Sequence, residues 1–209
     1  MAKILPFHGY LPPNNVAKEV SSPPYDVLNS KEARDIVRNN AKSFLRVIKP
    51  EVDLSDAKAA ENELVHQKAH NNLSAFIRKG LLIKDQKKCF YIYKISKNGH
   101  VQTGLVAAVS VKEYNDQKIK KHEHTRPEKE DDRTLHIGTT KANTGPVFLV
   151  FKNDGSFQDL LSSHSKMKSA IYFEADDGSY HSIKKIKHKN SIKTIKKYFK
   201  SVDNLYIAD

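Results

Sequence analysis

Two pairs of alternating apolar segments, each closed by a turn dipeptide, predict β-hairpins in this chain. The dipeptides are Asn98-Gly99 and Asp177-Gly178, which two-residue hairpin loops favour because both positions accept positive φ angles. Strands joined by such a short turn run antiparallel. The four predicted strands are Cys89–Ile95 with Val101–Ser110, and Ala170–Ala175 with Tyr180–Ile186.

Apolar positions at helical spacing predict helices on either side of these hairpins. Ser55 is the N-cap of the longest helix, and Gly80 marks its end, because glycine readily adopts the left-handed conformation that terminates helices. The predicted helices run from Asn29 or Ser30 to about Arg38, over Asp56–Lys79, and from Ser191 to about Lys200.

Further apolar runs predict single strands. Pro146–Lys152 is nearly all apolar, so we expect it at a central position in a sheet with both faces buried. We also expect a short first strand within Ile4–Tyr10 and another at Lys42–Ile48. Together these elements predict an α+β fold in which a mixed, largely antiparallel sheet carries flanking helices.

Length and composition fit one domain in a reducing compartment. A chain of 209 residues can bury a proper core, so we predict a single domain over residues 1–209. Its one cysteine, Cys89, excludes an internal disulfide framework. No apolar run reaches the roughly 18 residues of a membrane span, and the N-terminus has no signal-peptide core. We therefore predict a soluble, cytoplasmic protein without a membrane partner.

The net charge of +12 raises the question of a nucleic-acid partner. Only six of the 36 basic residues are arginines, and arginine is the better reader of phosphates and bases. The excess is local, since eight lysines and no acid lie between Lys184 and Lys200. This pattern favours a solvated lysine face, and binding of nucleic acid through this segment stays the alternative.

The stretch Lys118–Arg133, KIKKHEHTRPEKEDDR, concentrates the ionisable groups. Thr125 and Glu128 fit a capping box, and Pro127 suits a first turn, so a helix is predicted to start at Thr125. We expect it to run to about His136 and to end at Gly138 in the left-handed conformation.

Charges at the start of that helix predict an anion site. Arg126 and Arg133 are two turns apart on one face, and His122 and Glu123 just precede the helix, where exposed N–H groups favour phosphate or carboxylate. The alternative is a solvated face with weak ion pairs. A metal site at His122 and His124 is less favoured, because their spacing is not that of HExxH.

Two other segments contain candidate site residues. Pro23 and Pro24 stiffen the loop that presents Asp26, which makes Asp26 a candidate general base or metal-phosphate contact. The loop also suits a rigid entry to the next helix. His66 and His70 are spaced i, i+4 but lack the carboxylate of a zinc motif, so we expect both at the surface.

Several segments together resemble one bacterial family, catalogued as domain of unknown function ten-fifteen and often labelled ParB-like. These are Pro6-Phe7, SPPYDV at Ser22–Val27, CFYIYK from Cys89, HExTR at His122–Arg126 with the following DR, and GPVFL at Gly145–Leu149. Members are about twice as long, and Asp209 matches the first residue of their Asp-Gly-His-His-Arg motif. The resemblance implies the N-terminal part of a longer protein.

The ParB-like superfamily includes free serine kinases, and this implies phosphoryl transfer from ATP, ADP or CTP, with Mg²⁺, to a small hydroxyl metabolite such as serine. We expect activity only in the longer protein. The catalytic candidates are Glu123 and Asp26, and the phosphate-binding candidates are Lys121, His122, Arg126, Arg133 and Asp209.

Two geometric expectations follow from this hypothesis. Asp26, Glu123 and Arg126 should line one cleft, with Asp209 pointing towards it, because an active site brings distant groups within reach of one ligand. Apolar surface near Leu205–Ile207 is expected to lack a partner, which leaves a homodimer open. No residue is assigned to a metal site.

Overall fold

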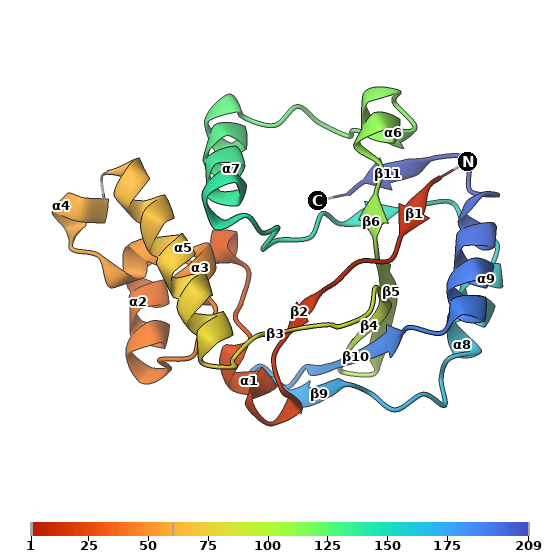
Figure 1. Cartoon of the computed structure of the whole chain (residues 1–209), viewed down its shortest axis with the longest axis horizontal. Coiled ribbons are helices and arrows are strands. Elements are labelled where there is room, and N and C mark those ends of the chain that lie inside the picture. Colours follow the sequence, from red (N-terminus) through yellow and green to blue (C-terminus); the bar gives the residue numbers. More distant parts are fainter. Residues whose placement is uncertain (1, 60, 209) are drawn as a thin grey trace. The chain divides into compact units, whose positions relative to one another are not determined.

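The computed structural model describes residues 2–59 and 61–208, which group into two compact units. Unit one comprises Met1–Asn14, Lys84–His124 and Val147–Asp209, and unit two comprises Asn15–Ile83 and Thr125–Pro146. Figure 1 shows strands in the first and helices in the second. The single-domain organisation stays a prediction.

The two predicted hairpins form the main sheet of unit one. Its strands pair antiparallel in the order β5-β4-β10-β9. Asn98 and Gly99 both have positive φ angles, as the tight turn between β4 and β5 requires. The hairpins are therefore confirmed, with strands at Phe90–Lys97 (β4), His100–Val106 (β5), Ile171–Glu174 (β9) and Tyr180–Ile186 (β10).

One continuous apolar cluster forms the core of unit one. Phe90 and Ile92 of β4 and Ile186 of β10 are buried in it. Helices α8 (Ser156–Ser162) and α9 (Lys189–Phe199) contribute to the same cluster through Phe157, Leu161, Ile195 and Phe199. The N-cap of α9 is His188 and not the predicted Ser191, so the helix begins three residues earlier than expected.

A second sheet in unit one overturns two expectations. Its order is β7-β11-β8, so β11 (Leu205–Ile207) is paired on both edges and Leu205 is buried. The expected unpaired apolar surface there is wrong. The strand β8 covers only Leu149–Val150 and lies at the edge. Leu149 packs against the core, whereas Val147 is 58 % exposed, so the prediction that this strand is buried on both faces was also wrong.

The parallel pairing of β11 with β7 makes the fold mixed, while the other pairs are antiparallel. The predicted α+β class is confirmed. The first predicted strand is divided in two. The short elements of unit one are Ile4–Leu5 (β1), Tyr10–Leu11 (β2), Ala108–Val109 (β6), Val111–Asn115 (α6) and Ile119–Lys120 (β7), and Ile83–Lys84 (β3) lies at its boundary.

Unit two consists of helices. The predicted cap of α2 (Ser30–Asn39) is confirmed, because Asn29 and Glu32 form a capping box. Its other elements are Ala17–Val20 (α1), Tyr25–Val27 (η2), Leu45–Ile48 (α3), Pro50–Asp53 (η3), Asp56–Ala59 (α4), Asn62–Arg78 (α5) and Pro127–Thr140 (α7), with Asn14–Val16 (η1) at the boundary.

Two elements of unit two differ from the prediction. The segment predicted as a strand contains the short helix α3, in which Leu45 and Val47 face two separate apolar clusters instead of one face of a sheet. The long helix is two helices, because Glu61 has an extended backbone with ψ 97° and acts as the N-cap of α5. Gly80, with φ 70°, follows the end of α5 as expected.

No helix among the described residues is long and apolar enough to cross a membrane.

Candidate functional site

The helix α7 carries most of the predicted charges, and it starts two residues later than predicted. Pro127 occupies its first turn and holds Arg126 extended, with φ −70° and ψ 128°. Arg126 is therefore the N-cap, and the Thr125–Glu128 capping box does not form. The Thr125 hydroxyl instead donates to Glu130 Oε2 at 3.1 Å.

The end of α7 also differs from the prediction. The helix continues through Gly138 to Thr140, and Lys141 adopts the left-handed conformation with φ 56°. The Thr140 hydroxyl donates to the carbonyl of His136 at 2.7 Å. The additional turn keeps Thr139 helical, and its carbonyl lies 3.1 Å from His70 Nδ1 of α5.

Three predicted site residues belong to unit one. Lys121, His122 and Glu123 follow β7 and are exposed. His122 Nε2 lies 3.6 Å from Glu123 Oε1, and Lys121 Nζ lies 4.6 Å from the centre of the Tyr114 ring. These contacts are local, and solvent screens interactions between exposed charges.

Three other predicted residues belong to unit two. Asp26 is exposed on η2, and Arg126 Nε lies 3.9 Å from Glu128 Oε1. Arg133 is half-buried, and its guanidinium carbon lies 4.6 Å from the centre of the Tyr25 ring. This contact joins the loop that carries Asp26 to α7 within one unit.

The expected convergence of Asp26 and Arg126 with Glu123 stays a prediction, because Glu123 belongs to the other unit. Asp209, the fourth member of that cleft, lies outside the described residues.

A polar cluster between α5 and α7 surrounds the Arg133 contact. Asp132 accepts a hydrogen bond from Arg133 Nε at 2.9 Å, and its other oxygen lies 3.3 Å from His66 Nε2. His66 is 2 % exposed, so its expected surface position was wrong. It lies three residues before Ala69 and seven before Leu73, both buried on α5, and this spacing along the apolar stripe indicates its burial.

His136 of α7 completes the cluster. It is 1 % exposed, and its ring meets that of His66 edge-to-face at 5.8 Å. Thr144 Oγ1 lies 3.2 Å from its Nε2. Burial, together with the positive charge of Arg133 and the neighbouring His66, lowers the pKa of His136 to about 4. His136 is therefore neutral at pH 7. The sequence reasoning did not single it out.

Both buried imidazoles retain unused hydrogen-bonding capacity. Within the described part of the chain, His66 Nδ1 and His136 Nδ1 are buried without a hydrogen-bond partner. Unpaired buried polar atoms cost free energy and concentrate at functional sites. The cluster thus presents a half-exposed carboxylate, Asp132, fixed between a guanidinium and a buried imidazole.

Residues 2–59 and 61–208 contain no group of three or more His, Cys, Asp or Glu side chains that could hold a metal ion.

Comparison with known proteins identifies one family. The model of the family described as "Protein of unknown function (DUF1015)" matches residues 4–209. No curated protein and no solved structure matches the chain.

Proposed function

This chain belongs to the DUF1015 family, whose description names no activity. We propose that it contributes to phosphoryl transfer from a nucleotide to a small hydroxyl metabolite, the reaction that the resemblance to ParB-like kinases implies. The nucleotide is ATP, ADP or CTP, and free serine is the model acceptor. Such transfer needs cations on the phosphates and a carboxylate that orients the hydroxyl.

The contact between Arg133 and Tyr25 carries this proposal. It connects the proline-stiffened loop of Asp26 to the helix that bears Arg126 and Arg133. A carboxylate and two guanidiniums from segments about 100 residues apart thereby belong to one packed unit. A solvated helix face would not require such a connection.

The proposed roles follow from charge and exposure. Arg126 and Arg133 bind the nucleotide phosphates, with Asp132 and Tyr25 fixing the orientation of Arg133. Asp26 accepts the proton of the acceptor hydroxyl. In unit one, Lys121 and His122 stay candidate phosphate ligands and Glu123 a candidate acid or base, as the sequence predicts.

Mg²⁺ would accompany the nucleotide and would not need a protein cage. It commonly keeps several waters and takes one or two carboxylates together with substrate phosphates. Asp26 is exposed and can provide one such oxygen ligand.

The test measures transfer from radiolabelled ATP, ADP or CTP to serine and other small hydroxyl compounds, using both this chain and the longer protein that the resemblance predicts. We expect Asp26→Asn to reduce turnover roughly 100-fold or more, and Arg133→Gln to weaken nucleotide binding. Asp131→Asn and Arg78→Gln remove the same charges at exposed positions of unit two and serve as controls. Absence of nucleotide turnover with every acceptor would refute the proposal.

Nucleic-acid binding is the second candidate, and the geometry of α9 supports it. Ile195 and Phe199 are buried in the core of unit one, while Lys193, Lys197 and Lys200 are exposed. Affinity for duplex DNA should then fall steeply with salt. Unchanged DNA retention after replacing Lys193, Lys196, Lys197 and Lys200 by Gln would exclude this candidate.

A further inference from the structure

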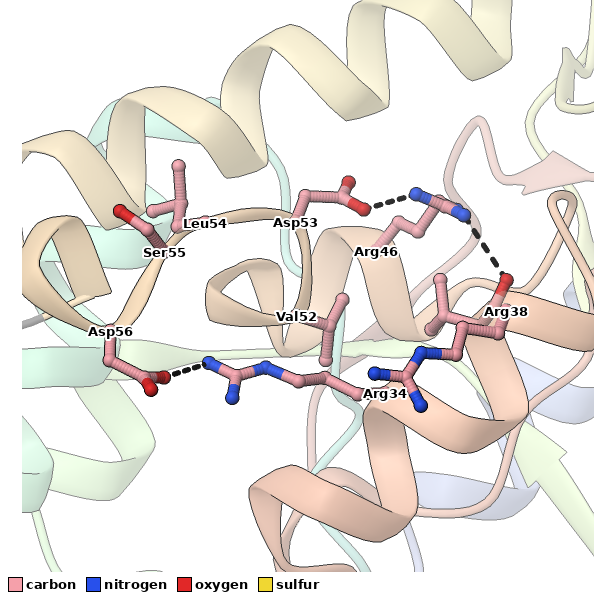
Figure 2. Close-up of a pocket in the computed structure, with 9 residues that line it drawn as sticks. Arg34, Arg38, Arg46, Val52, Asp53, Leu54, Ser55 and Asp56 are labelled. Atoms are coloured by element: carbon pink, nitrogen blue, oxygen red, sulfur yellow. Dashed lines mark hydrogen bonds and ion pairs between the residues drawn. The ribbon is translucent and has the colours of Figure 1, made fainter.

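We propose that a pocket of unit two, lined by Arg34, Arg38 and Arg46, binds a small phosphate-bearing molecule. The pocket has a volume of about 500 Å³, which is within the usual range for small-ligand sites. Figure 2 shows it between α2, α3 and the segment that leads into α4. It shares no residue with the cluster of Tyr25, Asp132 and Arg133, and therefore goes beyond the proposed function.

Two arginines of α2 supply the positive charge that a ligand can reach. Arg34 and Arg38 are four residues apart and so lie on one face of the helix. Figure 2 shows both side chains extending from α2 along the pocket. Arginine presents a planar fork of N–H donors that matches the oxygens of a phosphate.

The carboxylates that now pair with these two arginines can be exchanged for a ligand. Arg34 contacts Asp56 at 2.7 Å, but Asp56 is 88 % exposed. Arg38 contacts Asp35 at 3.0 Å, and Arg38 is itself 75 % exposed. Solvent-exposed ion pairs contribute only about 0 to 1 kcal/mol, so a phosphate with two charges can replace them at small cost.

Arg46 has a different part in the pocket. Its partner Asp53 is 12 % exposed and accepts a further hydrogen bond from Asn72 Nδ2 at 2.9 Å. A second guanidinium nitrogen of Arg46 donates to the carbonyl of Val37 at 3.2 Å. These bonds fix Arg46 as a wall of the pocket and leave Arg34 and Arg38 as the cations that a ligand can engage.

The remaining lining indicates what else the ligand carries. Val37, Val52 and Leu54 give the pocket an apolar part, and Ser55 adds a hydroxyl. Asp35, Asp53 and Asp56 pair with the three guanidiniums, and Lys68 Nζ lies 4.0 Å from Asp53 as a fourth cation, so positive charge is in excess by one and the site attracts anions. An organic phosphate with a compact apolar group fits both properties better than inorganic phosphate.

The experiment titrates the chain at low salt with inorganic phosphate, pyrophosphate, AMP and succinate, and follows binding by calorimetry. We expect a saturable binding component that depends on Arg34 and Arg38 and that prefers AMP or pyrophosphate to succinate. The variant Arg34→Gln/Arg38→Gln should bind at least about tenfold more weakly. The variant Arg34→Lys/Arg38→Lys keeps both positive charges but loses the planar N–H donors of the guanidinium groups, and it should also bind more weakly.

The matched control, Lys31→Gln/Arg78→Gln, removes two exposed charges of unit two outside the pocket and should bind as the wild type does. If both glutamine variants bind the ligand equally weakly, or if Arg34→Gln/Arg38→Gln binds it as the wild type does, the proposal that this pocket binds phosphate is wrong. If the chain binds succinate more tightly than AMP or pyrophosphate, the pocket does not select phosphate groups. Arg126→Gln should leave this binding intact, which separates failure of the pocket from failure of the proposed transfer reaction.

If Arg34→Gln/Arg38→Gln does not fold, NMR on the wild-type chain decides the question. Pyrophosphate should then shift the side-chain Nε–H signals of Arg34 and Arg38 and the methyl signals of Val52. Shifts confined to other residues would overturn the proposal.

Discussion

The two units differ in how they use polar and charged residues. All six arginines belong to unit two, whereas the cationic side chains of unit one are lysines and histidines. The core of unit one is a continuous apolar cluster, but that of unit two is divided into two smaller clusters. Among the described residues, unit two buries Ser43, His66, His136 and Thr140, and unit one buries His164 and Ser179.

Because their cores differ in this way, the two units have separate physical roles. A continuous apolar core stabilises unit one through burial alone. Unit two gives up part of that stabilisation to hold polar groups, whose burial is costly unless they are bonded. Guanidiniums recognise phosphates through paired N–H donors, so the unit that holds all six arginines is the better candidate for phosphate binding.

Phe90→Ala should have the largest effect on stability. Phe90 is fully buried in the core of unit one, and replacing a core phenylalanine by alanine costs about 3–5 kcal/mol. Urea denaturation measures the loss. Val101→Ala, on an exposed position of β5, is the control and should cost less than about 0.5 kcal/mol. Similar losses for both variants would contradict a single continuous core in unit one.

The hairpins and caps could be predicted because their signals are local. The pairs Asn98-Gly99 and Asp177-Gly178 lie in the two hairpin turns, and the capping box of Asn29 involves only Glu32, so each signal lies within a few residues. Pro146–Lys152 could not be placed, since its apolar residues do not reveal that β8 lies at an edge. Burial on both faces depends on neighbours that pair from distant parts of the sequence.

The candidate site residues were likewise predictable only where the signal is local in the sequence. The sequence singled out Arg133 and the loop of Asp26, and the structure connects them through Tyr25. It did not single out His136, and it placed His66 at the surface, because the contact between α5 and α7 joins residues about 70 positions apart. The arginine pocket was missed for a related reason, since Arg34 and Arg38 come together with Arg46, Asp53 and Asp56 in its lining only after folding.

The second prediction is that unit two loses stability at acidic pH. The pKa of His136 is about 4 in the folded chain, against an ordinary value of 6.5. The unfolded chain therefore binds more protons between these values, and stability falls as pH decreases from 6.5 to 4. The expected loss is about 3 kcal/mol. Urea denaturation at a series of pH values, followed by amide exchange in α5 and α7, measures it.

His136→Gln tests the origin of that loss. Glutamine cannot be protonated in this range, so the pH dependence between 6.5 and 4 should become shallower, even if the variant is less stable at pH 7. The ionisable groups around His136 are Arg133, His66 and Asp132, and none of them is changed. His124→Gln, at an exposed position, is the control. An unchanged slope in His136→Gln would show that other groups cause the acid sensitivity.

The smallest expected effect is the coupling between Tyr25 and Arg133, and it bears most directly on the proposed site. Tyr25→Leu removes the aromatic face, and Arg133→Gln removes the cation above it. A double-mutant cycle isolates their interaction from the bond between Arg133 and Asp132. We expect a coupling free energy of about 0.5–1 kcal/mol in urea denaturation, as is typical of partly exposed cation–π pairs.

Amide hydrogen exchange tests whether the contact between Tyr25 and Arg133 holds the loop that carries Asp26. If Arg133 holds the Tyr25 loop on α7, then Arg133→Gln should accelerate exchange at Asp26 and Val27, whereas Arg126→Gln, an exposed change on the same helix, should not. Coupling within experimental error together with unchanged exchange would mean that the loop is held by other contacts. Asp26 would then have no tested connection to the arginines of α7, and the phosphoryl-transfer proposal would lose the observation on which it rests.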